Sequence, residues 1–310
     1  MIFDSIKATM KTCLILTFSL LSITNCQDLN QQNLTDLRYP EVSLISTEKR
    51  VLHSKIIDQD FEIYISLPYH YFMSDTTYPV LFSLDANVKF GLTSNVVNNL
   101  ATLTREIPEI IVVGIAYPII DIADWAALRK RDTTPTSDPE YDKQWADFLN
   151  NATGRDDIVV QSGGADNFLA FIRDELIPFI ESNYRVSSTD RGLHGTSSGG
   201  LFILYTLFKY PELFQRYFAG SPSIKWDESY MYRLENDFAA SHKDLPVRLF
   251  MCVGGLESDS YINNFNKMNQ LLRSRNYPNL ELETLIFENE THGTTGPASI
   301  CRGLKILYKK

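Results

Sequence analysis

The sequence is poor in the residues that mark several classes of protein. Its 310 residues include four cysteines and five histidines, and none of them has the Cys-x-x-Cys or His-Glu-x-x-His spacing of a metal site. No glycine-rich phosphate or dinucleotide loop is present either. We therefore expect no metal and no organic cofactor. Cys252 and Cys301 suit no disulfide-rich scaffold, so we expect buried thiols, with a bridge between them as the alternative.

Positive charge is scarce as well. Lysine and arginine number 29 against 38 aspartates and glutamates, which gives a formal net charge of −9 at pH 7. A nucleic-acid partner requires a dense basic surface that neutralises phosphates, and no segment of this chain is basic enough. We therefore exclude nucleic acid as a partner. With 44% apolar and 22% charged residues, the composition is that of a globular protein with one large core.

The chain also lacks an apolar run of comfortable membrane-spanning length. The run Cys13–Ile23 is too short for that purpose, and it follows Lys7 and Lys11, which is the form of a secretory signal. Met1 and Met10 are both candidate starts, because either leaves the signal complete. We therefore expect an exported protein.

The end of this signal resembles a bacterial lipobox. The run SITNC closes on Cys26, which would become the lipidated first residue. We expect residues 1–25 to be removed, residues 26–40 to form a polar tether and residues 41–310 to form the catalytic domain. The expected location is therefore membrane-anchored, in the periplasm or at the cell surface, with Cys26 as the only membrane contact. A plain signal and a secreted protein are the alternative.

Strand-like and helix-like segments alternate along the rest of the chain. Residues 50–58 and 60–68 alternate apolar and polar side chains, as antiparallel strands do. Residues 78–86 and 107–117 are denser apolar runs typical of central parallel strands. Further strand-like runs are residues 216–224, 246–255 and 280–288. The pattern predicts an α/β protein with a mixed, mostly parallel sheet, helices on both faces and right-handed crossovers.

Three other segments have distinct expectations. Residues 118–165 are polar but carry Trp125, Tyr141 and Trp145, so we expect an ordered cap over a site. A helical repeat of apolar residues begins at Ala165. The last helix is expected to have Pro297 in its first turn.

The sequence Gly195-Thr-Ser-Ser-Gly199 matches Gly-x-Ser-x-Gly. A short strand-like run precedes it and an apolar helix follows, which is the strand–turn–helix context of a nucleophile elbow. Ser197 would sit on a strained turn, with glycines two positions either side so that strand and helix can approach. The helix start would favour negative charge on a reacting oxygen, and the N–H of Ser198 would be one oxyanion donor. The alternative is a glycine- and serine-rich helix cap without chemistry.

A serine nucleophile needs a histidine base at the carboxyl edge of the sheet. His292 meets that requirement, since it follows the last strand. Four histidines are less well placed, because they lie within or before strands: His53, His70, His194 and His242.

An acid must hold that histidine in the right tautomer. Glu257 follows the preceding strand and is the preferred candidate. Asp259, two residues on, and Asp227, after the strand before that, are the alternatives.

Together, residues 163–185, 193–227, 253–257 and 291–293 resemble the esterase family of α/β-hydrolases that includes siderophore (enterobactin and salmochelin) esterases. This family is related to feruloyl esterases and mycolyl transferases. The resemblance implies an α/β-hydrolase fold, and it implies the following roles: Ser197 as nucleophile, His292 as base, Glu257 as acid and the N–H of Asn87 as second oxyanion donor. It also implies that the run Arg129–Pro135 lies near the substrate pocket, so that Arg129 and Arg131, with Trp125 of the cap, are candidate pocket residues.

These observations predict an exported serine esterase that cleaves a small-molecule carboxylic ester through an acyl-enzyme. Siderophore, feruloyl and acetyl-sugar esters are all compatible substrates. An acyltransferase is a close variant, in which an alcohol replaces water in the second step. The other alternative is a ligand-binding module that keeps the hydrolase scaffold without activity.

Overall fold

A computed structural model describes residues 42–119 and 121–309 of the chain. Leu44–Lys310 form one compact unit. The predicted signal, the tether and Cys26 lie outside the described residues. Within the described part, no helix combines the length and the apolar character that crossing a membrane requires.

Eight strands form one mixed sheet in the order β1-β2-β4-β3-β5-β6-β7-β8. Their bounds are β1 Thr47–Ser54, β2 Gln59–Ser66, β3 Tyr78–Ser83, β4 Ile111–Ala116, β5 Val186–Thr196, β6 Arg216–Gly220, β7 Arg248–Gly254 and β8 Glu281–Phe287. The pairs β1–β2 and β2–β4 are antiparallel, and every other pair is parallel. The predicted mixed, mostly parallel sheet is confirmed, because the alternating runs form the antiparallel edge and the dense apolar runs form the centre.

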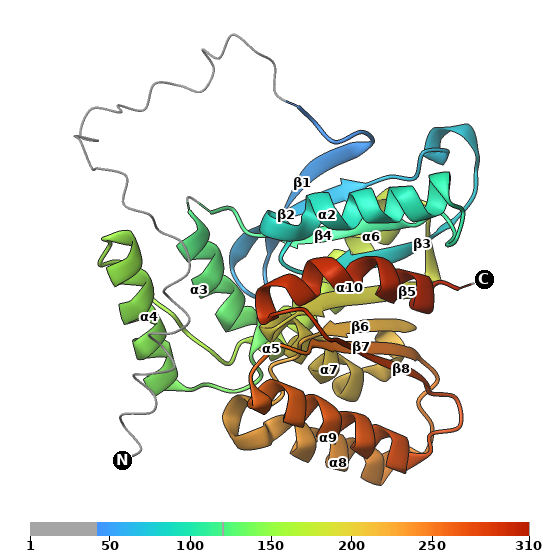
Figure 1. Ribbon diagram of the computed structural model, residues 1–310. Coiled ribbons are helices and arrows are strands. Elements are labelled where there is room, and N and C mark those ends of the chain that lie inside the picture. The colour runs from blue at the N-terminus through green and yellow to red at the C-terminus, as the bar shows by residue number, and fades with distance from the viewer. Residues whose placement is uncertain (1–41, 120, 310) are drawn as a thin grey trace, which may run out of the picture. The chain divides into compact units, whose positions relative to one another are not determined.

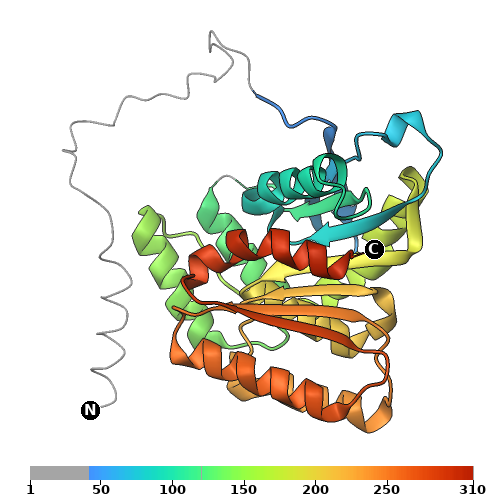
Figure 2. The same ribbon diagram turned by 45° about the vertical axis from the view of Figure 1, so that its right-hand side comes forward.

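Helices cover both faces of this sheet, as predicted (Figures 1 and 2). α2 (Ala86–Asn98) and α10 (His292–Leu307) lie side by side on one face. The other face carries α6 (Ile177–Asn183), α7 (Ser198–Lys209) and α9 (Asp259–Arg275), with α8 (Trp226–Ser241) beside α7. Each face has its own buried apolar cluster. Shorter elements are η2 Tyr71–Met73, η3 Asn99–Leu103, α5 Ala165–Phe171, η4 Ile172–Leu176 and η5 Pro211–Leu213.

The helix predicted from Ala165 is present but not uniform. It runs from α5 into a π-helical turn, Ile172–Leu176, and then into α6. Pro178 is near the start of α6 and has no N–H to donate to the preceding turn. A local widening at such a position is a common way for a helix to accommodate proline.

The prediction that Pro297 lies in the first turn of the last helix is wrong. α10 begins five residues earlier, at His292. Thr291 and Thr294 form a reciprocal capping box, in which the side chain of each accepts from the backbone N–H of the other. Pro297 therefore lies inside the helix, where it leaves the carbonyl of Gly293 without its usual donor.

The polar excursion between β4 and α5 is an ordered cap. It contains α3 (Ile122–Thr133) and α4 (Pro139–Thr153), each started by an aspartate whose side chain accepts backbone N–H bonds. A small apolar cluster of its own joins the two helices: Ala123, Ala127, Leu149, Ile158 and Val160. The cap is thus held in place by packing as well as by hydrogen bonds.

Candidate active site

Ser197 sits at a sharp turn between β5 and α7. Its backbone has φ 62° and ψ −122°, a strained conformation for a residue with a side chain. A Cβ atom at Gly195 would lie 2.8 Å from the carbonyl carbon and oxygen of Gly199. One at Gly200 would lie 2.7 Å from the carbonyl oxygen of Gly220. Glycine is therefore required at positions 195 and 200. The expectation that Gly199 is needed for the same reason is wrong, because a Cβ atom there would make only ordinary contacts, at 3.5 Å or more.

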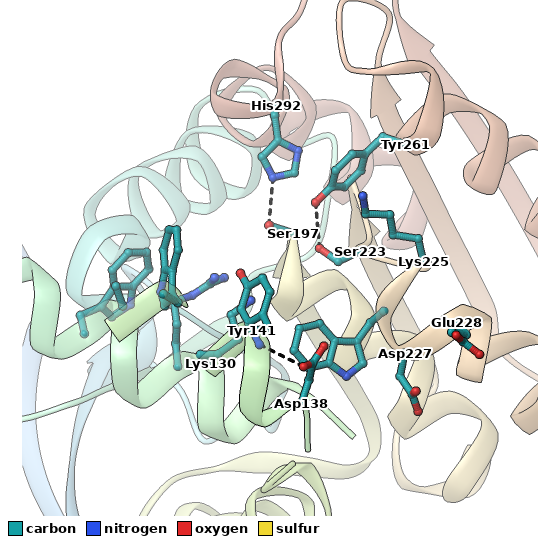
Figure 3. Close-up of a pocket in the computed structure, with 15 residues that line it drawn as sticks. Lys130, Asp138, Tyr141, Ser197, Ser223, Lys225, Asp227, Glu228, Tyr261 and His292 are labelled. Carbon is teal, nitrogen blue, oxygen red and sulfur yellow. Dashed lines mark hydrogen bonds between the residues drawn. The ribbon is translucent and has the colours of Figure 1, made fainter. Parts of the chain in front are cut away.

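The structure brings three of the predicted residues into one hydrogen-bonded chain, and Figure 3 shows its Ser197–His292 link. Nε2 of His292 lies 2.9 Å from Oγ of Ser197, and Nδ1 of His292 lies 2.6 Å from Oε2 of Glu257. His292 is the first residue of α10, so the capping box at Thr291 also fixes the position of the imidazole. Ser197, His292 and Glu257 thus have the arrangement of a nucleophile, a base and an orienting acid.

Glu257 is buried and fully hydrogen-bonded. Its Oε1 accepts bonds from Oγ of Ser221 at 2.5 Å, the N–H of Gly254 at 2.8 Å and Oγ1 of Thr295 at 3.2 Å. Burial raises the pKa of this carboxyl, but the hydrogen bonds from His292, Ser221 and Gly254 outweigh it and keep the pKa below its usual value. The side chain is therefore ionised and rigid at neutral pH.

The two alternative acids lie elsewhere. Asp259 is the exposed first residue of α9. Asp227, in the first turn of α8, lines the large cavity but faces Arg233, with 3.6 Å between its Oδ2 and Nη2 of that arginine. Glu257 is the carboxylate that the structure places against His292.

Both residues predicted as oxyanion donors are at helix starts. Ser198 is the first residue of α7 and Asn87 the second of α2, positions whose N–H groups have no partner within the helix. The Asn87 side chain binds both backbone groups of Tyr117, at 2.8 and 2.9 Å, and so fixes α2 to the end of β4. Their role towards a reacting oxygen stays a prediction.

A cavity of about 770 Å³ opens beside Ser197 (Figure 3). Its lining comes from the cap, from the loop after β6 and from α8, α9 and α10: Trp125, Ala126, Arg129, Lys130, Asp138, Tyr141, Trp145, Ser197, Ser223, Lys225, Trp226, Asp227, Glu228, Tyr261 and His292. Among the described residues, no cluster of three or more metal-binding side chains occurs.

Two of the three predicted pocket residues line this cavity. Trp125 and Arg129 do, and the guanidinium of Arg129 lies 4.9 Å from the ring centroid of Trp125. Arg129 also binds both oxygens of buried Asp85, at 2.7 and 2.9 Å, and the carbonyl of Thr196 at 3.2 Å. Arg131 does not line the cavity, because its guanidinium binds the buried carboxylate of its neighbour Asp132 at 2.7 and 3.0 Å.

Sequence reasoning missed Tyr261 and Ser223. Their hydroxyl oxygens are 3.0 Å apart, and the Tyr261 ring lies 4.6 Å from the His292 ring, centroid to centroid. Burial raises the pKa of Tyr261, whose hydroxyl also interacts with Ser197. The signal was available, because Tyr261 lies in the first turn of the helix that follows the Glu257 loop, at the same edge of the sheet as the other site residues.

Lys130 was also missed as a candidate. Its ammonium lies 4.7 Å from the Tyr141 ring centroid and 5.1 Å from that of Trp226. Burial, together with the positive charge of Arg129, lowers the pKa of Lys130 to about 8. The cavity therefore has a cation and aromatic faces close to the nucleophile.

The two cysteines left open by the sequence are both free. Cys252 is buried in β7, and burial raises the pKa of its thiol to about 12. Cys301 is exposed on α10, so the expectation of a buried thiol is wrong there, and so is the alternative of a bridge.

The sheet order, the elbow at Ser197 and the helices on both faces define an α/β-hydrolase. More narrowly, the chain belongs to the family described as "Putative esterase", whose model matches residues 54–153 and 150–283. It is 30% identical to the ferri-bacillibactin esterase BesA of Bacillus subtilis over 268 residues, covering 84% of this chain and 88% of that protein. A siderophore enterobactin esterase of Emericella nidulans is 38% identical over 119 residues, 38% of this chain and 37% of that protein.

Comparison with solved structures also finds esterases and hydrolases with this fold. The BES protein of Bacillus cereus superposes with a TM-score of 0.75 at 28% identity, covering 88% of this chain and 99% of that one. The siderophore hydrolase EstB of Aspergillus nidulans superposes with a TM-score of 0.67 at 25% identity, covering 87% and 98%. Together with the family match, these relatives identify the chain as a carboxylic ester hydrolase.

Proposed function

We propose that Ser197, His292 and Glu257 form the catalytic triad of this esterase. The observation that carries the proposal is the unbroken hydrogen-bonded chain from Oγ of Ser197 through both ring nitrogens of His292 to a buried carboxylate. Ser197 Oγ attacks the ester carbonyl while Nε2 of His292 takes its proton. The N–H of Ser198 stabilises the oxyanion, with that of Asn87 as the second donor.

The remaining steps follow from the same groups. His292 returns the proton to the alcohol oxygen as the C–O bond breaks, which leaves an acyl group on Ser197. A water molecule then attacks this ester, again giving its proton to Nε2, and the acid departs as Ser197 regains its hydrogen. Glu257 stays ionised throughout and stabilises the imidazolium that forms in each step.

For the substrate we propose an ester-linked siderophore. The support comes from the printed names of the relatives, which are a ferri-bacillibactin esterase and a siderophore enterobactin esterase. The cavity has suitable chemistry: aromatic faces from Trp125, Tyr141 and Trp226 beside the cations of Arg129 and Lys130. Such a surface suits aromatic groups that carry negative charge.

The acidic residues of the cavity do not remove its preference for negatively charged aromatic groups near Ser197. Asp138 caps α4 through the N–H of Tyr141, and Asp227 lies nearest Arg233. Figure 3 shows Asp227 and Glu228 on the side of the cavity away from His292. Arg129 is paired with Asp85, so of these two cap cations it is Lys130 that acts on whatever approaches Ser197.

We also propose that the protein is exported and held at a membrane by a lipid on Cys26. The support is the charged start, the short apolar run and the SITNC sequence. Incorporation of labelled palmitate into the chain, lost in Cys26→Ser, is the expected result. Release of an unlabelled protein into the medium would instead indicate a plain secretory signal.

The functional test is hydrolysis of ferri-bacillibactin, its iron-free form, a feruloyl sugar and acetylated xylan, with the released acid measured. We expect cleavage of the siderophore at a kcat/KM well above that of the other esters. Ser197→Ala should abolish turnover but retain binding, whereas Asp259→Asn, which changes an exposed residue outside the cavity lining, should keep most activity. Binding without hydrolysis in the unmodified protein would transfer the assignment to a ligand-binding module, and acyl transfer to an added alcohol would make it a transferase.

A further inference from the structure

A second, smaller cavity lies between α2 and α10, the two helices that are neighbours in Figure 1. Its volume is about 240 Å³. The lining residues are Val88, Lys89, Leu92, Thr93, His194, Thr196, Gly293, Gly296, Pro297 and Ile300. None of them lines the catalytic cavity, although Thr196 precedes Ser197 and Gly293 follows His292.

The first turns of α10 leave this space open because they carry glycines. A Cβ atom at Gly293 would meet nothing within 4 Å, and one at Gly296 would meet only Thr196, at 3.6 Å or more. The apolar walls come from Val88, Leu92, Pro297 and Ile300. A dry apolar cavity of about 150 Å³ can hold benzene, so this pocket has room for one six-membered ring and a polar group.

His194 supplies an unsatisfied polar atom in the lining. It is 3% exposed, its Nδ1 lies 3.0 Å from Oγ of Ser83, and its Nε2 is buried with no partner in the described part of the chain. Burial, together with the charge of Lys89, lowers the pKa of this imidazole to about 3, so it is neutral at pH 7. When Ser83 donates to Nδ1, the proton is on Nε2, which is then a buried donor without a partner in the described part of the chain.

The charge of the pocket is positive. Lys89 lies 3.6 Å from Asp85 and donates to Oγ1 of Thr196. Both oxygens of Asp85 are already held by Arg129, so the three side chains together carry one positive charge when Lys89 is protonated, although burial lowers the pKa of Lys89. No acidic side chain is among the described residues that line the pocket. One positive charge neutralises a singly charged anion. A doubly charged phosphate would keep one negative charge without a partner in the pocket, which is unfavourable for a buried ion.

We propose that the pocket between α2 and α10 binds a small monocarboxylic acid with a compact apolar body. Its carboxylate accepts a hydrogen bond from Lys89, and its body packs between Leu92 and Ile300. None of the described residues that line this pocket lines the catalytic cavity, so the acid binds without occupying that cavity.

The test uses the purified protein with ¹³C-labelled isoleucine methyl groups and benzoate as the probe. The Ile300 methyl signal is assigned with Ile300→Val. We expect benzoate to shift this signal saturably, with a Kd on the order of 1 mM. Benzyl alcohol, which has the body without the charge, and acetate, which has the charge without the body, should each bind about tenfold more weakly or not at all.

Variants locate the binding. Lys89→Met should weaken benzoate binding about tenfold, whereas Lys130→Met, its counterpart in the catalytic cavity, should leave the Ile300 shift unchanged. Leu92→Trp fills the pocket and keeps Lys89, so it should remove the shift even if Lys89→Met does not fold. The proposal is overturned if benzoate leaves Ile300 unmoved, if benzyl alcohol binds equally well, or if the shift survives Leu92→Trp.

Discussion

Replacing Glu257 by glutamine tests the orienting role of the buried acid. The two side chains have nearly the same shape, but the amide offers only one oxygen. Three donors converge on Oε1 of Glu257, from Ser221, Gly254 and Thr295, while Oε2 has His292 as its hydrogen-bond partner among the described residues. In Glu257→Gln the amide oxygen must therefore stay with the three donors, and the NH₂ group must face His292.

An NH₂ group can only donate, so it forces Nδ1 of His292 to lose its proton and Nε2 to carry it. Nε2 can then no longer accept the proton of Ser197, from which it is 2.9 Å away. The wrong tautomer in a serine triad costs kcat about 10⁴-fold, and we expect a loss of that size. Because the hydrogen bonds to Oε1 remain, the free energy of unfolding should fall by no more than about 1–3 kcal/mol.

The assay is kcat for p-nitrophenyl acetate and for the siderophore, with thermal unfolding measured in parallel. Asp259→Asn is the matched control, since it removes a carboxylate two residues away that does not contact His292; its kcat should stay near that of the unmodified enzyme. The reasoning is refuted if Glu257→Gln keeps kcat within about tenfold, or if Asp259→Asn causes the larger loss.

Three further changes have definite expectations. The pKa of Lys130 is about 8, so its charge is present below that pH and lost above it. KM for the anionic ferric siderophore should therefore rise as pH passes 8, and Lys130→Met should raise KM at pH 7 and remove that pH dependence. A KM profile that is unchanged in Lys130→Met would exclude a role of Lys130 in binding. Tyr261→Phe removes the hydroxyl 3.0 Å from Ser223 but keeps the ring against His292. We therefore expect kcat to fall about tenfold with little change in Tm. Full activity would show that the hydroxyl is dispensable. Gly195→Ala places a Cβ atom 2.8 Å from the Gly199 carbonyl. This change should destabilise the fold by about 1–3 kcal/mol, which is measured as a lower Tm. Gly293→Ala is the control, because a Cβ atom there meets open space, and it should not lower Tm.

Much of the fold was predictable because the pattern of apolar and polar residues within a strand depends on whether one or both faces of that strand are buried. The alternating segments before residue 68 became the antiparallel edge, and the dense runs at β3 and β4 became central strands. His292 and Glu257 were predicted from a topological rule, that catalytic loops leave the carboxyl ends of parallel strands, and the structure brings their side chains into contact. That rule needs only the order of elements along the chain.

The wrong or missing predictions fall at positions where two local sequence signals conflict, or where tertiary packing determines which way a side chain points. Pro297 suggested a helix start, but the capping box at Thr291 outweighed it. Arg131 was assigned to the pocket, yet its own neighbour Asp132 takes its charge. Lys130 and Tyr261 reach the cavity because α3 and α9 turn those faces towards Ser197, and this orientation depends on contacts far apart in the sequence.

The most direct measurement is covalent labelling of the purified protein with a fluorophosphonate, followed by intact mass and peptide mapping. A nucleophile activated by His292 should take up one phosphonyl group per chain, located on Ser197, and labelling should disappear in Ser197→Ala and in His292→Ala. An unlabelled protein, or a label on any other residue with Ser197 free, would contradict the account.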